Sequence, residues 1–289
     1  MQGALVVLMV AAATWDGWRW YLERVRAEPE EAAALAVTVL FLAAAGWVHR
    51  SKLASALPVS RLPLALLLAA YAASHLLLPP IMRAALAIAA TLFALYQAAL
   101  RERPPAAFWG LVALALPVLS SLQFVLGYPM RIVSAALSVA LLNAQGLGVD
   151  RQGTFLSWRG EMLQFDAPCS GVNMLWAALL LTLMGCVLLR FGVLKVAAAV
   201  ALSTVLSIAC NVLRASSLFY VEAGLVPHAP AWWHDGIGIA AFSLSAAVTL
   251  WMLRRCSSPD GAKRHPGTPP PHFADAPCGL QPEPVAWAQ

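Results

Sequence analysis

Charged residues are scarce in this chain. Asp, Glu, Lys and Arg together make up 11% of its 289 residues, whereas hydrophobic residues make up 61%. A soluble domain normally carries about 25% charged residues. Apolar runs long enough for a bilayer-spanning helix recur along the sequence. These features exclude an ordinary soluble domain and predict an all-α polytopic membrane protein.

Paired cysteines are also missing. The five cysteines include no CxxC pair and no Cys/His spacing typical of a metal site, so we expect neither a metal nor another cofactor. Their odd number argues against a complete disulfide framework. Cys186 and Cys210 lie inside apolar runs, where a cysteine usually behaves as a small hydrophobic residue. We therefore expect these two cysteines to pack rather than react.

Three further absences narrow the function. The formal net charge is +5, but no nucleic-acid recognition motif accompanies it, so we expect no nucleic-acid partner. Met1-Gln2-Gly3 carries no positively charged side chain before the first apolar run. A secretory signal peptide would carry one, so we expect a first span that is retained. No internal repeat of the kind common in transporters relates the two halves of the sequence.

Apolar runs between charged connections predict about eight transmembrane helices. The segment 132–149 is also apolar, but it carries Asn143 and Gln145 and ends near the sequence GLG. We therefore expect it to form one additional interfacial or re-entrant helix. The predicted spans are residues 3–14, 32–48, 62–79, 84–100, 106–126, 171–189, 196–214 and 237–253.

The distribution of basic residues predicts the orientation, because Lys and Arg are enriched on the cytoplasmic side of membrane proteins. We assume a cytoplasmic N-terminus and a segment 132–149 that does not cross. The cytoplasmic connections and tail then hold Arg50, Lys52, Arg61, Arg101, Arg103, Arg190, Lys195, Arg254, Arg255, Lys263 and Arg264. The other basic residues are spread over longer connections on the opposite side.

Residues 150–168 form the longest polar stretch between predicted spans. The residues on either side of Arg159-Gly160 predict a small hairpin, which the orientation places on the extracytoplasmic side. The chain then divides into N-terminal transmembrane spans at 1–130 and a membrane core at 131–255, which contains this loop and the candidate site residues considered next. The tail at 256–289 is rich in proline, and we expect it to be cytoplasmic and disordered.

The sequence DAPCSGVNMLW, residues 166–176, places Cys169 where this polar loop meets an apolar helix. Pro168 suits the start of a helix, and Ser170 can cap its first turn. Gly171 permits the close approach of a substrate backbone. The unpaired N–H groups and the positive dipole end of the helix favour a thiolate at this position. The alternative at this stage is a cysteine that only packs at a helix end.

Arg214 follows a long apolar run in the sequence CNVLRASS, with Asn211 one turn earlier on the same helix face. A charge at such depth usually faces a polar interior and serves function. The alternative is an arginine that extends to the outer membrane interface. Both interpretations stay open at this stage.

His234 and Asp235 open the last predicted span, in the sequence WWHDGIG. In the predicted topology, Cys169, Arg214 and His234 all lie at the extracytoplasmic ends of helices. A thiol, a guanidinium and an imidazole supply the nucleophile, the oxyanion stabiliser and the general acid/base that acyl transfer needs. Asp235 either orients His234 or is a solvated loop carboxylate.

The sequences APCSGVNML, NVLR and HDGIG, in this order, resemble the exosortase/archaeosortase family of membrane-embedded protein-sorting enzymes. The segment NAQGLGV before the cysteine is also similar to that family. The resemblance implies that Cys169 is the nucleophile, Arg214 the oxyanion or substrate stabiliser and His234 the general acid/base. The supporting residues are Ser170, Gly171, Asn211 and Asp235.

The resemblance also implies the partners and the location. The partners are exported proteins with a C-terminal tripartite (PEP-CTERM-like) sorting signal, which consists of a short motif, a transmembrane helix and a basic cluster. Cleavage beside the motif proceeds through a Cys169 acyl-enzyme, whose acyl group passes to an acceptor. The enzyme would span the bacterial inner membrane, in contact with lipid, with its active site on the extracytoplasmic face.

Two other functions compete with this interpretation. A non-catalytic polytopic transporter or assembly scaffold is the first, but transporters place their polar residues near the midplane, whereas here they gather at one interface. An intramembrane serine protease that uses Ser170 is the second. No Gly-x-Ser-x-Gly frame surrounds that serine, so it is the weaker of the two.

Overall fold

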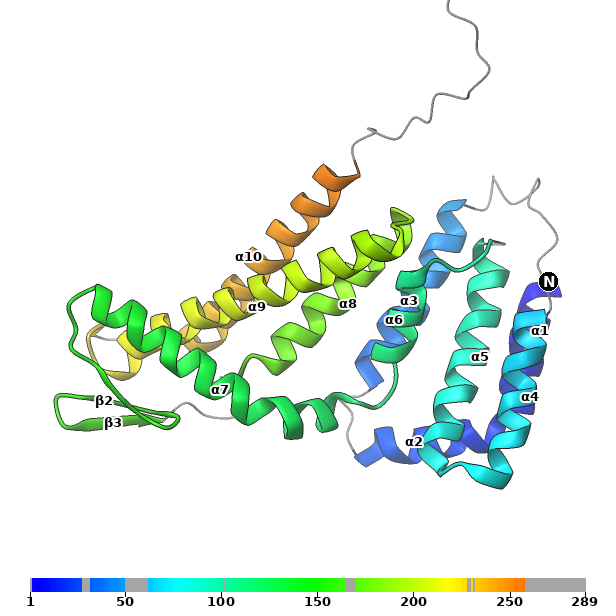
Figure 1. Ribbon diagram of the computed structural model, residues 1–289, viewed down its shortest axis with the longest axis horizontal. Helices are drawn as coiled ribbons and strands as arrows, with labels where there is room; N and C mark the ends of the chain where they lie inside the picture. Colours follow the sequence, from blue (N-terminus) through cyan, green and yellow to red (C-terminus); the bar gives the residue numbers. More distant parts are fainter. Residues whose placement is uncertain are drawn as a thin grey trace, which may run out of the picture. The chain divides into compact units, whose positions relative to one another are not determined.

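Helices make up most of the protein (Figure 1). The computed structural model describes residues 2–27, 32–49, 62–100, 102–164, 170–227, 230 and 232–257. The helices follow the apolar runs, and most of their ends fall near a proline, a glycine or a charged connection. Their bounds are α1 Gln2–Ala13, α2 Trp15–Ala27, α3 Ala32–His49, α4 Leu62–Leu77, α5 Pro80–Leu100, α6 Ala106–Leu114, α7 Leu119–Ala144, α8 Val172–Leu188, α9 Val193–Glu222 and α10 Trp233–Cys256. Three strands, β1 Asp150–Gln152, β2 Phe155–Trp158 and β3 Glu161–Gln164, lie between α7 and α8.

Helix α5 is the centre of the N-terminal part, because α1, α2, α3 and α4 all pack against it. Three of these contacts pair a glycine with an alanine of α5. We consider a Cβ atom added to each glycine. It would lie 3.0 Å from the Cβ of Ala98 for Gly3 of α1, 2.7 Å from the Cβ of Ala87 for Gly17 of α2, and 2.8 Å from the Cβ of Ala99 for Gly46 of α3. Small residues let membrane helices approach closely, so that van der Waals packing holds them together.

Helix α2 is an element that the apolar pattern does not predict. Its sequence, WDGWRWYLERVRA, mixes charged and aromatic residues and falls in the predicted connection between the first two spans. Gly17 and Tyr21 form its buried face. On its exposed face, Arg19 Nε and Glu23 Oε1 form an ion pair at 3.3 Å. Its amphipathic character explains why it is a helix without a long apolar run.

The predicted boundaries between 106 and 149 are wrong. Helix α6 ends at Leu114, and the chain leaves the helical conformation before Pro117, a residue that lacks a backbone N–H and disfavours helix before it. A single helix, α7, then runs from Leu119 through Pro129 to Ala144. The segment 132–149, expected as a separate interfacial or re-entrant helix, is therefore mostly the second half of α7.

Four helices of the described residues are long and apolar enough to cross a membrane, namely α5, α7, α9 and α10. Shorter apolar helices cover Gly3–Ala13, Ala32–Val48, Leu62–Leu77 and Val172–Leu188. These helices support a multi-pass membrane protein, while eight crossings stay a prediction.

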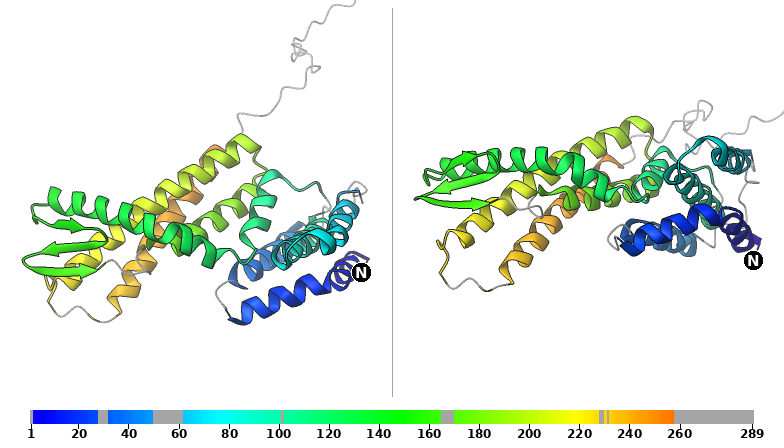
Figure 2. Two further views of the ribbon diagram at one scale, coloured as in Figure 1. Left: turned by 60° about the horizontal axis from the view of Figure 1, so that its bottom comes forward. Right: turned by 90° about the horizontal axis from the view of Figure 1, so that it is seen from below.

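Helices α8, α9 and α10 pack against one another and lie side by side in Figures 1 and 2. Thr182 of α8 donates a hydrogen bond from Oγ1 to Ser203 Oγ of α9 at 2.9 Å. A Cβ on Gly185 of α8 would lie 2.7 Å from Leu253 of α10, so those two helices are also in close contact. Helix α7 packs against both α8 and α9. These four helices carry the candidate site.

The three strands form one antiparallel sheet in the order β1-β2-β3. The turn between β2 and β3 lies at Arg159 and Gly160, which both have positive φ. Leu156 and Trp158 of β2 belong to an apolar cluster with Phe219 of α9, and the Trp158 and Phe219 ring centroids are 5.9 Å apart. The sheet therefore packs beside the last turns of α9. Its extracytoplasmic side stays a prediction.

Candidate active site

Helix α8 begins directly after Ser170 and Gly171. Cys169 lies outside the described residues. The structure describes the residues that follow it, from Ser170 onward. Ser170 is buried, and its Oγ accepts a hydrogen bond from the backbone N–H of Val172 at 3.4 Å. This bond occupies one of the N–H groups that a helix start leaves without a helical partner. Gly171 has a φ of +77°, in the left-handed region that favours glycine.

Gly171 is in close contact with Asn211 of α9. A Cβ on Gly171 would lie 2.6 Å from Cγ of Asn211, so the carboxamide occupies the space that a side chain at 171 would need. Asn211 is 1% exposed, and its Nδ2 donates a hydrogen bond to Ser134 Oγ of α7 at 2.9 Å. Asn211 therefore connects the start of α8 to both α9 and α7.

Arg214 lies one turn after Asn211 on α9 and reaches α10. Its Nε is 3.3 Å from the position that a Cβ on Gly238 would occupy. His234 lies four residues before Gly238, on the same face of α10. Arg214 is partly buried, whereas His234 and Asp235 are exposed. Among the residues that the structure describes, no side-chain hydrogen bond joins His234 to Asp235, so the orienting role of Asp235 has no contact to support it.

The contacts of Gly171, Asn211 and Arg214 form a polar layer between two apolar clusters. One cluster includes the first turns of α8 and reaches Ala199 of α9. The other joins the second half of α7, the sheet and α9 from Ala215 onward. Three of the predicted site residues, Gly171, Asn211 and Arg214, thus lie within one turn of α9 and its contacts. Cys169 immediately precedes this layer in the chain.

Three residues of α7 beside this layer were missed by sequence reasoning. Ser134 accepts the hydrogen bond from Asn211. Gln123 donates a hydrogen bond from Nε2 to Asn173 Oδ1, in the first turn of α8, at 2.7 Å. Arg131 lies between them on the helix. Each is a polar residue inside a long apolar run, and that interruption is the signal that indicates them.

Several predictions from the sequence concern residues outside the described ranges. They are the nucleophilic thiol of Cys169, the position of Pro168 at a helix start and the disordered state of residues 258–289. These stay predictions. The helix that follows Cys169 and the helices that carry Arg214 and His234 are all described.

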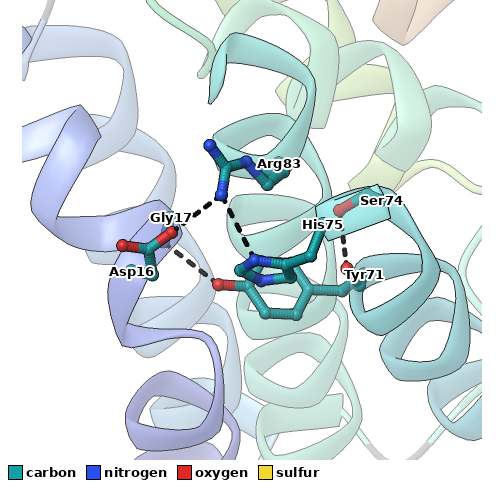
Figure 3. A network of polar contacts seen from close by, with 6 residues as sticks. All are labelled: Asp16, Gly17, Tyr71, Ser74, His75 and Arg83. Atoms are coloured by element: carbon teal, nitrogen blue, oxygen red, sulfur yellow. Dashed lines mark hydrogen bonds and ion pairs between the residues drawn. The ribbon is translucent and has the colours of Figure 1, made fainter. Parts of the chain in front are cut away.

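A second polar cluster lies where α2, α4 and α5 meet (Figure 3). Arg83 Nη1 donates a hydrogen bond to Asp16 Oδ2 at 3.1 Å and lies 3.2 Å from His75 Nδ1. A guanidinium only donates, so Nδ1 of His75 accepts. The Tyr71 hydroxyl accepts a hydrogen bond from the Gly17 N–H at 3.1 Å. Because Arg83 is paired with a carboxylate and the cluster joins three helices, we assign it to helix packing.

The recurring apolar helices make the chain a multi-pass membrane protein. The family model described as transmembrane exosortase matches residues 1–251, and the chain therefore belongs to the transmembrane exosortase family. The match includes the first five predicted spans, which the short motifs did not reach. The searches of curated proteins and of solved structures found no match.

The contact between Gly171 and Asn211 gives a first prediction. Gly171→Ala should lower the unfolding temperature and sharply reduce processing of a substrate. An alanine at positive φ costs roughly 1–2 kcal/mol, and crowding against a packed neighbour adds about 1–3 kcal/mol. Thermal unfolding in detergent and a processing assay would measure both effects.

Gly224→Ala is the matched control, because Gly224 also has a positive φ of +67° but no atom within 4 Å of an added Cβ. This variant should lose only the stability that an alanine at positive φ costs, and it should keep its processing activity. Equal losses in the two variants would show that the Asn211 contact is unimportant.

Proposed function

We propose that this transmembrane exosortase is a cysteine peptidase/transpeptidase that cleaves C-terminal sorting signals of exported proteins through a Cys169 acyl-enzyme. The observation that carries the proposal is the pair of contacts from α9. Asn211 contacts Gly171 at the start of α8, two residues after Cys169, and Arg214 contacts Gly238, one turn after His234. These two contacts bring α9 beside the start of α8 and beside the first half of α10, and this proximity supports the proposal.

In the first half of the reaction, the Cys169 thiolate attacks the carbonyl carbon of the scissile peptide bond. The carbonyl oxygen then carries the negative charge of the tetrahedral intermediate. Collapse of this intermediate breaks the C–N bond, and protonated His234 gives its proton to the leaving amine. The products of this half are a thioester on Cys169 and the released C-terminal segment with its transmembrane helix.

In the second half, an acceptor amine, an acceptor hydroxyl or water attacks the thioester carbonyl. His234 takes the proton of the attacking group, and the Cys169 thiolate leaves. Hydrolysis gives a free carboxylate on the processed protein, whereas transfer gives an amide or an ester. His234 ends with the proton that it had at the start, so the cycle balances.

Arg214 would hold the oxyanion in both halves. The guanidinium is planar, keeps its charge and presents donors in a fixed fork. It is partly buried between α9 and the Gly238 position of α10, and donors in such a place act more strongly than in water. The absence of a side chain at Gly238 is what leaves room for it. This contact favours a role in the site over an arginine that merely extends to the interface.

The proposed substrates are exported proteins that end in a short motif, a transmembrane helix and a basic cluster. The proposed location is the bacterial inner membrane, with the site on the extracytoplasmic face. A candidate substrate is a short secreted protein, encoded in the same genome, that has this C-terminal arrangement. Its intact mass, measured with and without the enzyme, tests the proposal.

A new C-terminus beside the motif is the expected result. A mass that ends in a free carboxylate indicates hydrolysis, and a larger mass identifies the acceptor. A substrate that keeps its C-terminal helix in the presence of the enzyme contradicts the proposal.

The predicted topology is testable separately. A reporter fused after Arg159, in the turn between β2 and β3, should be active on the extracytoplasmic side. A reporter fused after Arg255, at the end of α10, should be active in the cytoplasm, because that end carries two adjacent arginines. Paired alkaline phosphatase and fluorescent protein fusions measure each side. The same side for both positions would refute the predicted face of the site.

A further inference from the structure

Arg131 is the sole charged residue of α7 and lies near the middle of that helix. A charged residue inside an apolar membrane helix is costly and usually faces a polar interior. The positions that share its face, at three, four, seven and eleven residues further along, are Ser134, Ala135, Ser138 and Leu142. All four are buried, and Ser134 contacts Asn211. The face that begins with Arg131 is therefore the one that α7 packs against α9.

The hydrogen bond and the ring contact that Arg131 makes with described residues both come from its own helix. Its Nε donates to the Gly127 carbonyl oxygen at 3.4 Å, and its guanidinium carbon lies 5.9 Å from the centroid of the Tyr128 ring. In the part of the chain that the structure describes, no carboxylate pairs with it. Other arginines have such partners, since Arg83 pairs with Asp16 and Arg190 with Glu102.

The described residues beside this part of α7 add positive charge. Gln123, two turns earlier on α7, is hydrogen-bonded to Asn173 in the first turn of α8. This bond and the Ser134–Asn211 bond place Arg131 on the stretch of α7 beside the start of α8. That first turn contains no acidic residue, and a helix start carries a partial positive charge. The guanidinium of Arg214 lies one turn beyond Asn211 on α9.

We propose that Arg131 binds a carboxylate side chain of the peptide segment that enters the site, and so acts as a specificity-determining residue. The inference rests on the proposed function, since it assumes that a peptide reaches Cys169. A guanidinium pairs with a carboxylate through two parallel hydrogen bonds. A peptide with an acidic residue near the scissile bond would be held by Arg131, while Arg214 stays available for the oxyanion.

The first experiment measures the charge that a reagent meets at Cys169, without any substrate. The full chain carries Cys186→Ala, Cys210→Ala, Cys256→Ser and Cys278→Ser, so that Cys169 is the one remaining thiol. The purified protein in detergent is treated with two methanethiosulfonate reagents, one bearing a sulfonate and one a trimethylammonium group. The ratio of the two rates reports the local charge and cancels general changes in thiol reactivity.

Arg131→Gln should lower the sulfonate-to-ammonium rate ratio by about tenfold, the lower end of the range for electrostatic effects on association. Arg131→Lys should keep most of the ratio, because it keeps the charge. Arg19→Gln, a change on the exposed face of α2, is the matched control and should leave the ratio unaltered. An unchanged ratio in Arg131→Gln overturns the inference, including the case in which a carboxylate of the chain itself, such as Asp166, already neutralises Arg131.

The second experiment identifies the source of the anionic group. Acidic residues near the cleavage point of a processed substrate are changed to amides, one at a time. One such change should reduce processing by the wild type about tenfold or more, and Arg131→Gln should then cause no further loss. Additive losses in the two changes overturn the inference. So does a preference for the sulfonate reagent that is abolished by anionic phospholipid vesicles but not by free phosphate, because Arg131 would then bind a lipid headgroup. Processing that survives Cys169→Ala would instead refute the proposed function.

Discussion

Cys169→Ala is expected to abolish processing and to leave the substrate uncleaved, with its C-terminal helix attached. The substitution removes the thiolate that forms the acyl-enzyme, and no described residue near the start of α8 offers a comparable nucleophile. Ser170 is adjacent, but its Oγ accepts a hydrogen bond from the Val172 N–H and has no strong base beside it among the described residues. Intact-mass measurement of the substrate checks the result.

The variants that accompany this test separate chemistry from folding. Cys169→Ser should keep at most a trace of activity, because a hydroxyl is a poor nucleophile without a strong base. His234→Ala should be nearly as severe as Cys169→Ala, because the leaving amine loses its proton donor. Cys186→Ala is the matched control, since Cys186 is fully buried in α8 and should be dispensable for chemistry. Wild-type processing by Cys169→Ala would overturn the whole proposed mechanism.

Arg214→Lys is expected to reduce processing by ~10²-fold or more, the usual scale for the loss of one oxyanion donor. Lysine keeps the positive charge but lacks the planar fork. The Nε of Arg214 lies 3.3 Å from the position that a Cβ on Gly238 of α10 would occupy, and a lysine ammonium cannot reproduce that placement with two parallel donors. Single-turnover processing rates of a substrate in membranes would measure the effect.

Arg19→Lys is the control for this second prediction. Arg19 lies on the exposed face of α2 and pairs with Glu23, an interaction that lysine can replace at little cost. It should leave the processing rate unchanged. A nearly silent Arg214→Lys would show that Arg214 only extends to the membrane interface, and it would leave the roles of Cys169 and His234 intact.

The sequence predicts the helices best where an apolar run ends at a strong boundary. Helices α3, α4, α8 and α10 begin and end within a few residues of the predicted spans. Helix α2 is not predicted, because its charged residues make the segment look like a polar connection between the first two spans, although it forms an amphipathic helix. The boundaries of α6 and α7 are predicted wrongly because the sequence stays apolar through Pro117 and Pro129, while only Pro117 breaks the helix. Composition does not distinguish a proline that breaks a helix from one that a helix accommodates.

The candidate site was likewise predictable only in part. Short motifs predict that the residues around Cys169 and Arg214 lie at helix ends. Gly171 does precede the first residue of α8, but the prediction is wrong for Arg214, because α9 continues past it to Glu222. The motifs do not predict that Asn211 occupies the space beside Gly171, because that contact depends on how α8 and α9 pack. Ser134 and Arg131 were missed since a lone polar residue in an apolar run has no spacing pattern. The contact of Ser134 with Asn211, from which the proposed role of Arg131 is argued, depends on how α7 packs against α9.

The glycine–alanine contacts of α5 bear on how the protein assembles in the cell. A chain is synthesised from its N-terminus, so α1, α2 and α3 are made before the alanines of α5 that they pack against. Until α5 emerges, the faces at Gly3, Gly17 and Gly46 have lipid or water beside them in place of their final neighbour. Helix α5, against which the other four helices pack, is thus the last of the five to be made. The contacts of these three helices with α5 can therefore form only after α5 has been synthesised.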